Sequence, residues 1–234
     1  MNILITGGSQ GIGYGIAEAC AQAGHDLFLV AREKEKLHQA AKELSLKYHQ
    51  RILSHSLDIS DPKAVHALAD LVQQEKFLPD VLVLNAGIWL DGDIAKTTPE
   101  VFHQLMEVNV ASSFYFVHHF RALLKKSMYP RIIMIGSTAG IEPHHHSGGS
   151  LYSVSKWATH GLAVNLRQEL MSDGIGVTHV APGNVVTPMW DADEIRPERM
   201  MQRSDIGKMV AAALTLSPQA VVEELVIRPL KGNV

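Results

Sequence analysis

The stretch that most constrains the fold is the glycine-rich segment at residues 6–13, Thr-Gly-Gly-Ser-Gln-Gly-Ile-Gly. An apolar run at residues 2–5 precedes it and predicts a strand, and a helical pattern follows it as far as Gly24. Glycines allow positive φ angles and a close approach of a ligand to the backbone. The turn also gathers free N–H groups at the positive end of a helix, which suits a phosphate. We interpret the segment as a phosphate-binding turn, with a plain tight turn as the alternative.

Apolar runs and helical patterns then alternate along the chain. Strands are predicted at residues 26–31, 51–57, 80–84, 131–135, 175–181 and 224–228, and helices at 33–48, 99–124, 150–173 and 204–216. Such alternation is typical of a parallel sheet covered by helices. We therefore expect an α/β fold with a single Rossmann-type doubly wound sheet of about seven strands, helices on both faces, and one domain over residues 1–234.

A Tyr-x-x-x-Lys pair, Tyr152 and Lys156, opens the predicted helix at residues 150–173. Side chains four residues apart lie on the same face of a helix. The lysine charge is expected to lower the pKa of the phenol, which is near 10 in the free residue, and to make it a usable general acid or base. Taken alone, the pair is also compatible with an ordinary wet helix face.

Other polar residues follow predicted strands, where a parallel sheet binds its ligands. Ser137 comes directly after the strand at 131–135, and Asn85 follows the strand at 80–84. Asn109 interrupts an apolar stretch, so it either bonds to backbone or holds a water near the site. Asp58 ends the third strand and either contacts adenine or accepts bonds within its own turn.

Arg32 follows the second predicted strand and indicates which cofactor is bound. In dinucleotide-binding folds an acidic residue at this place binds the ribose 2′-hydroxyl, whereas an arginine accommodates a 2′-phosphate. The chain has Ala31 and Arg32 there. NADP(H) is therefore favoured over NAD(H), and a merely solvated arginine is the alternative.

Composition excludes several other classes of protein. The formal net charge is −3, which argues against binding nucleic acid by bulk charge. No apolar run approaches the length of about 20 residues that a membrane helix needs, and no signal peptide is visible. The single cysteine, Cys20, lies in a helical pattern and is expected in the core. A cytoplasmic protein without nucleic-acid or membrane partners is the expectation.

Together these motifs resemble the short-chain dehydrogenase/reductase family over essentially the whole chain. The markers, all in family order, are residues 6–13, Asn85–Gly87, Asn109, Ser137, Tyr152, Lys156, Pro182, Gly183 and Thr187. The resemblance implies alcohol–carbonyl chemistry with Tyr152 as acid/base, Ser137 bonding the substrate oxygen, Lys156 tuning Tyr152 and holding the nicotinamide ribose, and Asn109 supporting a water. It also implies cofactor contacts from Gly7, Ser9, Gln10, Gly11, Ile12, Gly13, Arg32, Asp58, Ile59, Asn85, Ala86, Gly87, Tyr152, Lys156, Pro182, Gly183, Val185 and Thr187.

The chain departs from the family pattern at two places. Gln10 stands where many NADP-preferring relatives carry a basic residue, which leaves Arg32 as the main support for NADP. The loop before Tyr152 is longer than usual and contains His144, His145 and His146. Consecutive residues rarely converge on one ion, so we expect no metal site and treat this loop as a border of the substrate pocket.

The expected function is reduction of a small carbonyl compound, or oxidation of the alcohol, by a homodimer or homotetramer. One alternative is a 3-oxoacyl-(acyl carrier protein) reductase, for which the basic residues Lys125, Lys126, Arg131, Arg196, Arg199 and Arg203 are too dispersed to decide. The other is a non-catalytic NADP-binding regulator. Met189, Trp190, Met200 and Met201 are either an adaptable cover over the substrate or ordinary packing.

Overall fold

The computed structural model describes residues 1–90, 94–95, 97–142, 149–190 and 196–233, and a parallel sheet of seven strands forms its centre. The strands are β1 (Asn2–Thr6), β2 (Asp26–Ala31), β3 (Ile52–Ser56), β4 (Val81–Leu84), β5 (Arg131–Ile135), β6 (Gly176–Pro182) and β7 (Glu224–Ile227). Their order is β3-β2-β1-β4-β5-β6-β7, so the sheet grows in opposite directions from the β1–β4 pair. The prediction of a Rossmann-type sheet of about seven strands is confirmed.

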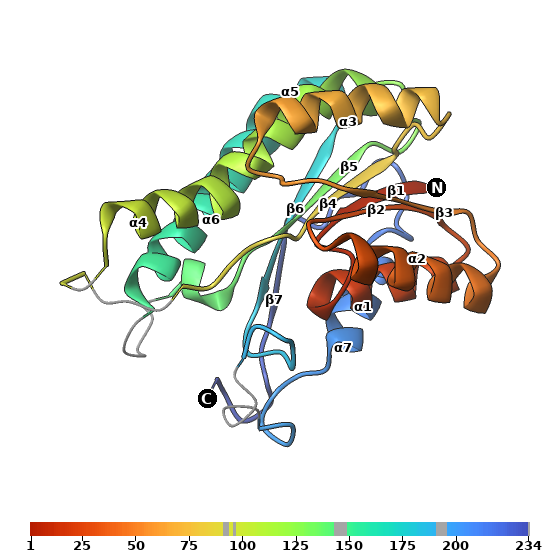
Figure 1. Cartoon of the computed structure of the whole chain (residues 1–234). Helices are drawn as coiled ribbons and strands as arrows, with labels where there is room; N and C mark the ends of the chain where they lie inside the picture. Colours follow the sequence, from red (N-terminus) through yellow and green to blue (C-terminus); the bar gives the residue numbers. More distant parts are fainter. Residues whose placement is uncertain (91–93, 96, 143–148, 191–195, 234) are drawn as a thin grey trace.

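Helices cover both faces of this sheet (Figure 1). One face carries α1 (Gly11–Gln22), α2 (Lys34–Tyr48) and α7 (Arg203–Ala213), and the other carries α3 (Pro62–Gln74), α5 (Ser112–Leu124) and α6 (Ser150–Leu170). Successive strand residues point to opposite faces. In β1, Ile3 and Ile5 therefore pack with the first group of helices, while Leu4 packs with the second.

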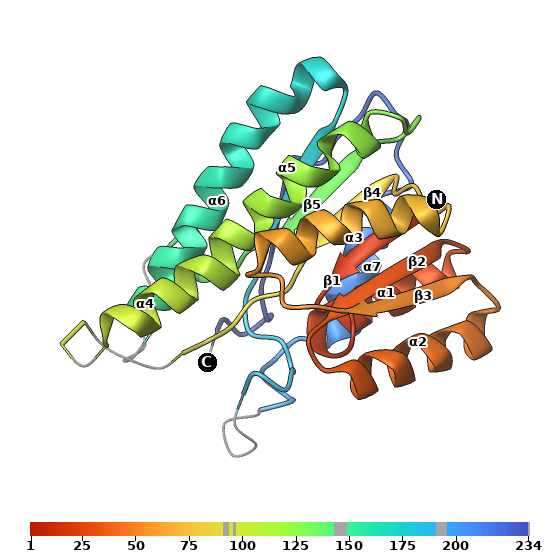
Figure 2. The same cartoon turned by 45° about the horizontal axis from the view of Figure 1, so that its top comes forward.

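The segment predicted as one helix at residues 99–124 is divided in the structure. It consists of α4 (Pro99–Met106), a π-helical turn at Glu107–Ala111 and α5. Figure 2 shows α4 and α5 following each other beside α6. The π turn contains the buried Asn109, whose side chain bonds to residues outside its own helix, so the wider turn gives that side chain its direction.

Two glycines let α1 and α7 pack closely although they are far apart in the sequence. A Cβ added at Gly15 would lie 2.5 Å from the carbonyl oxygen of Arg203, and one at Gly207 would collide with the carbonyl of Gly15. Cys20, on the same helix as Gly15, is completely buried as expected, and burial raises the pKa of its thiol to about 12. The close contact fixes the start of α1, which immediately follows the glycine turn.

No helix within the part of the chain that the structure describes is long and apolar enough to cross a bilayer.

Candidate active site

The glycine turn between β1 and α1 has the geometry of a phosphate cradle. Gly7 and Gly11 have φ angles of +67° and +56°, which only glycine adopts readily. A Cβ on Gly13 would collide with the carbonyl of Gly7. The first turn of α1 has no acidic residue, and the helix has no side-chain cap, so its N–H groups are available to an anion. These features fit the pyrophosphate of a dinucleotide.

Thr6 joins this turn to the residues that follow β4. Its buried hydroxyl accepts hydrogen bonds from the backbone N–H groups of Asn85, at 3.0 Å, and Ala86, at 3.1 Å. The Asn85 amide donates to the carbonyl of Thr6 at 2.9 Å. The structure therefore brings Gly7 and residues 85–87 together at the point where the order of strands reverses, which is where such sheets bind ligands.

Arg32 lies exposed at the end of β2, near Asp58, as expected for a residue that meets the adenosine ribose. The carboxylate of Asp58 accepts bonds from the N–H of Ser60, at 3.0 Å, and from its hydroxyl, at 2.7 Å. These bonds hold the pKa of Asp58 below its usual range. Of the two roles open to Asp58, the structure has the local turn acceptor; Ile59 beside it is buried.

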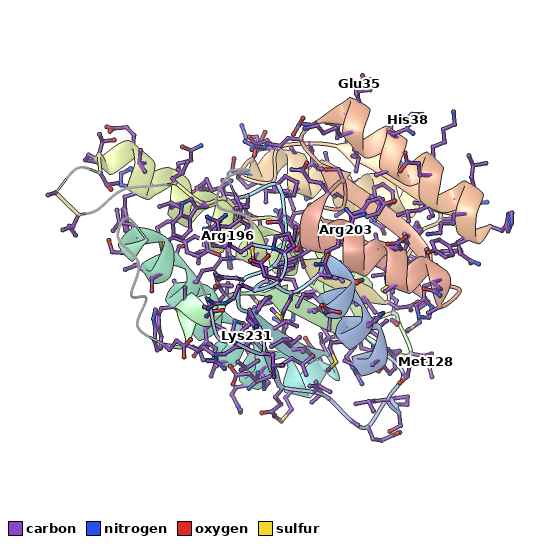
Figure 3. The ribbon with its side chains drawn as sticks, turned by 90° about the horizontal axis from the view of Figure 1, so that it is seen from below. Glu35, His38, Met128, Arg196, Arg203 and Lys231 are labelled. Atoms are coloured by element: carbon purple, nitrogen blue, oxygen red, sulfur yellow. The ribbon has the colours of Figure 1, made fainter. Side chains whose placement is uncertain are left out.

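A cavity of about 480 Å³ begins at Ser9 and Gln10 and extends between α1, α2 and α7. Figure 3 looks onto this face, with Glu35 of α2 and Arg203 of α7 labelled. The Arg203 guanidinium lies 4.5 Å from the centroid of the Tyr14 ring and covers it. The cavity therefore adjoins the outer side of the glycine turn, and none of its lining residues belongs to the Tyr–Lys group.

The segment after β6 returns to the glycine turn from the other side. A Cβ on Gly11 would lie 3.5 Å from the side chain of Thr187, and Val185 pairs with Met201 in an isolated bridge. Gly183, next to Pro182, donates its N–H to Ile227 at 2.7 Å. Thr187 therefore lies against the glycine turn, and the cofactor-lining role of Val185 and Thr187 stays a prediction from the family resemblance.

Ser137 and Tyr152 meet at the carboxyl edge of the sheet. Ser137 comes two residues after the end of β5, and Tyr152 lies in the first turn of α6. The Ser137 hydroxyl lies close enough to the Tyr152 phenol to lower its pKa, and the Ser137 oxygen accepts a hydrogen bond from the N–H of Ala139 at 3.1 Å. The ring of Trp89 packs at 4.7 Å from that of Tyr152. Two hydroxyls therefore converge where a carbonyl oxygen can accept from both.

Lys156 lies buried beneath Tyr152, with 6% of its surface exposed. Its Nζ atom is 5.5 Å from the centroid of the Tyr152 ring and 3.4 Å from the carbonyl oxygen of Ile135. A Cβ on Gly87 would lie 3.5 Å from this Nζ atom, so Gly87 packs directly beside it. Burial, which disfavours the charged amine, lowers the pKa of Lys156 to about 8.

The expected lowering of the Tyr152 pKa is not what the structure has. Burial raises the pKa of the phenol to about 12, and the hydrogen bond from Ser137 opposes this shift. Lys156 lies over the face of the ring and bonds to Ile135 rather than to the phenol oxygen. The spacing of Tyr152 and Lys156 in the sequence does not show that both are buried. The effect of burial on the pKa of Tyr152 is larger than that of the nearby lysine.

Asn109 anchors the segment that carries Gly87 and Trp89. Its amide oxygen accepts the N–H of Ile88 at 2.8 Å, and its amide nitrogen donates to the carbonyl of Ile88 at 3.0 Å and to the hydroxyl of Ser155 at 3.0 Å. Of the alternatives left by the sequence, bonding to backbone is therefore present. The amide oxygen also lies 3.1 Å from where a Cβ of Gly87 would be, beside Lys156.

Sequence reasoning missed Thr6, Trp89 and Ser155 as parts of this site. Thr6 precedes the glycines of the turn, and Ser155 precedes Lys156. Their positions in the sequence do not show in which direction either hydroxyl points. Met200 and Met201 are buried, which supports ordinary packing for these two residues, whereas Met189 is half exposed. His144, His145 and His146 lie outside the described residues.

Comparisons with known proteins agree with this geometry. A family model described as short chain dehydrogenase matches residues 1–197. The sepiapterin reductase of Chlorobaculum tepidum is 31% identical over 242 residues, which cover 99% of this chain and 97% of that protein.

Two solved structures have the same fold along nearly their whole length. The alcohol dehydrogenase of Thermococcus sibiricus, complexed with 5-hydroxy-NADP, has a TM-score of 0.91 and 27% identity, covering 100% of this chain and 98% of that one. The L-sorbose reductase of Gluconobacter frateurii, complexed with NADPH and L-sorbose, has a TM-score of 0.89 and 25% identity, covering 99% and 95%.

Proposed function

Because this chain belongs to the short-chain dehydrogenase/reductase family, we propose that it is an NADP(H)-dependent oxidoreductase that interconverts a small carbonyl compound and its alcohol. One observation carries the proposal. The hydroxyls of Ser137 and Tyr152 lie together beside a buried Lys156, at the carboxyl edge of the sheet that also carries the glycine turn. This arrangement binds and protonates an oxygen atom.

The residues of the chain divide the chemistry between them. NADPH, when bound, supplies the hydride. Ser137 donates a hydrogen bond to the carbonyl oxygen, and Tyr152 gives that oxygen a proton as negative charge develops on it. Tyr152 then recovers a proton through Lys156, whose pKa near 8 allows it to exchange protons close to neutral pH. Trp89 packs on the Tyr152 ring and limits its movement.

The preference for NADP(H) rests on charge at the end of β2. Arg32 is exposed there and no acidic residue stands at Ala31, so a 2′-phosphate meets a cation rather than a carboxylate. Solved structures similar to this chain were obtained with NADP-type cofactors, which supports the same assignment. The individual cofactor contacts implied by the family resemblance are part of this proposal.

The two alternatives are less well supported. A carrier-protein reductase needs a patch of basic residues, but Arg131 is 4% exposed, and Lys125 at the end of α5 and Arg203 at the start of α7 lie on opposite faces of the sheet. A non-catalytic regulator would have no need of the hydroxyls of Ser137 and Tyr152 together beside a buried lysine. We therefore retain the small-molecule reductase.

Formation of a homodimer or homotetramer is also proposed. Phe114 of α5 is 50% exposed, and Trp157 and Val164 of α6 are 47% and 40% exposed. Apolar side chains of this size on two neighbouring helices are typical of a protein–protein interface. Size-exclusion chromatography with light scattering tests this point, and a monomer at micromolar concentration contradicts it.

A panel of carbonyl compounds tests the function. Ketones, aldehydes, diketones and ketoses are incubated with the protein and NADPH or NADH, and loss of the reduced-nicotinamide absorbance is followed. We expect at least one small carbonyl substrate, used faster with NADPH, and no signal from Tyr152→Phe. Activity restricted to acyl carrier protein thioesters would favour the carrier-protein reductase, and NADPH binding without turnover of any compound would favour the regulator.

A further inference from the structure

Two imidazoles and a carboxylate meet at the β6–β7 edge of the sheet. His160 comes from α6, His179 from β6 and Glu224 from β7. One potential ligand atom from each residue lies within 4.8 Å of the other two. Within the described part of the chain, this is the one group of three histidine, cysteine or acidic side chains whose potential ligand atoms lie so close together. No sequence pattern predicts it, because its members lie on three separate elements.

The two distances from the carboxylate of Glu224 match those between the ligands of a metal ion. Glu224 Oε1 lies 3.4 Å from His160 Nε2 and 3.4 Å from His179 Nδ1. Ligand atoms about 2.0–2.1 Å from zinc, at tetrahedral angles, are about 3.4 Å apart. A good hydrogen bond between nitrogen and oxygen is shorter, about 2.7–3.2 Å. The carboxylate therefore stands at metal-ligand spacing from both rings and at a long distance for hydrogen bonding to either.

Burial adds a second, independent observation. His179 is completely buried, and its Nε2 atom, which faces Gly136, has no hydrogen-bond partner in the described part of the chain. Its other ring nitrogen has only the distant Glu224 oxygen. Burying an imidazole that is so poorly paired costs free energy, and a metal bond at Nδ1 would offset the part of that cost that arises at Nδ1.

The cluster also has an open side. The side chains of His160 and Glu224 are 23% and 40% exposed, so solvent reaches the group from the surface. The two rings are stacked with their centroids 4.6 Å apart and their planes at 19°, so one ring must turn for both nitrogens to face a single ion, and the solvent-facing His160 is the one free to do so. Three protein ligands with access to water are the arrangement of a four-coordinate site whose last position is filled by solvent.

We propose that His160, His179 and Glu224 bind a divalent transition-metal ion, with Zn²⁺ as the best match. Two imidazoles and one carboxylate favour zinc over calcium or magnesium, which take oxygen ligands. The site is separate from the Ser137–Tyr152 pair. It would tie α6, which carries the catalytic residues, to the two strands at the edge of the sheet.

Metal titration of the full-length protein without a polyhistidine tag tests the proposal. After treatment with a chelator, Co²⁺ is added and the visible absorption of four-coordinate Co²⁺ is recorded, and Zn²⁺ affinity is measured by calorimetry. We expect one ion per chain and a higher Tm with Zn²⁺. His160→Gln and Glu224→Gln, both at the solvent side, should each weaken Zn²⁺ binding by at least about 100-fold, since even outer-shell changes cost about 10–100-fold.

Two control variants address the other histidines. His119→Gln disrupts the surface pair in which His66 and His119 have Nδ1 atoms 3.3 Å apart. A triple variant replaces His144, His145 and His146 with glutamine. Both controls should keep the Co²⁺ spectrum and the Zn²⁺-dependent Tm increase. Absence of Zn²⁺ binding in the wild type, unchanged affinity in His160→Gln and Glu224→Gln when both are folded, or loss of binding in a control overturns the site.

Discussion

The cofactor-binding half and the catalytic half of the candidate active site differ in which part of the chain forms them. The cofactor half consists of backbone: Gly7 and Gly11 at positive φ, Gly13 against a carbonyl, and Thr6 holding the next strand end. The catalytic half consists of ionisable side chains that burial has moved away from their ordinary pKa values, as with Tyr152. The first half contributes to stability through its packing, whereas the second is costly to bury.

This difference separates what a substitution affects. At the glycine turn of the cofactor half, the shape of the backbone is what binds the cofactor, so a change there that weakens binding should also weaken the fold. In the catalytic half, chemistry and stability oppose each other, so a change that removes activity can leave the fold unaffected or strengthen it. Four substitutions test this contrast.

The largest effect is expected for Tyr152→Phe. Removing the phenol hydroxyl takes away the proton donor, and turnover should fall by about 10²–10⁴-fold. NADPH affinity and Tm should stay near the wild-type values, because the ring and its packing on Trp89 are retained. Steady-state kinetics and fluorescence titration measure the two quantities. Tyr115→Phe on α5 is the matched control, because it removes a hydroxyl that is bonded to Glu107 and should keep full turnover. Unchanged turnover in Tyr152→Phe would show that Tyr152 takes no part in the chemistry.

Lys156→Met should abolish activity and yet stabilise the protein. The pKa of Lys156 falls from 10.5 to about 8 on folding, so below pH 8 the folded protein carries a buried charge that the unfolded chain exposes. The folded-state pKa is depressed, so this cost is fully present at pH 7 and disappears as pH rises from 8 to 10.5. The gain in unfolding free energy at pH 7 should be on the order of 2–3 kcal/mol.

Urea unfolding at pH 7 and pH 10 measures this gain, which should be smaller at pH 10. Lys63→Met, at an exposed position of α3, is the control and should change stability little. A loss of stability in Lys156→Met at pH 7 would mean that the bond from Lys156 to the Ile135 carbonyl outweighs the burial of its charge.

Gly13→Ala should damage cofactor binding and stability together. The new Cβ would meet the carbonyl of Gly7, which forces the turn to open. We expect a loss of about 1–3 kcal/mol in unfolding free energy, as for other overpacked sites, together with weaker NADPH binding. Gly161→Ala in α6 is the control, because nothing lies within 4 Å of its added Cβ, and it should gain about 0.5–1 kcal/mol. Loss of binding without loss of stability would contradict the contrast between the halves.

The smallest effect is expected for Arg32→Ala, which leaves the fold alone. It should weaken NADPH binding by about tenfold, the equivalent of one charged contact of about 1.4 kcal/mol, and NADH binding much less. Dissociation constants for both cofactors give the answer. Lys42→Ala, an exposed change on α2, should affect neither cofactor. Equal losses for NADPH and NADH in Arg32→Ala would overturn the assignment to NADP.

The sheet and the cofactor half could be predicted from sequence because their signals are local. Apolar runs predicted all seven strands, and the glycines of residues 6–13 predicted a turn with positive φ angles. Ser137 and Tyr152 were predicted to meet, because Ser137 lies at the carboxyl end of a predicted strand and the family resemblance gives both residues a role at the same substrate oxygen. The effect of the Ser137 hydroxyl on the pKa of Tyr152 agrees with that expectation.

The remainder depends on contacts between distant parts of the chain. The pKa of Tyr152 was expected to fall, but it rises because burial outweighs the lysine four residues away. The π turn in the predicted helix at residues 99–124 reflects bonds of Asn109 to Ile88 and Ser155, 21 and 46 residues away. His160, His179 and Glu224 come together only through the order of the strands.

The glycine contact between α1 and α7 has a consequence for biosynthesis. Gly15 leaves the ribosome long before Gly207, which must lie against it to complete the packing of α1. The nascent chain therefore holds its nucleotide-binding turn half assembled until almost the whole protein has been translated. A ribosome-stalled chain ending before residue 203 should be unable to retain NADPH, although every glycine of the turn is already present.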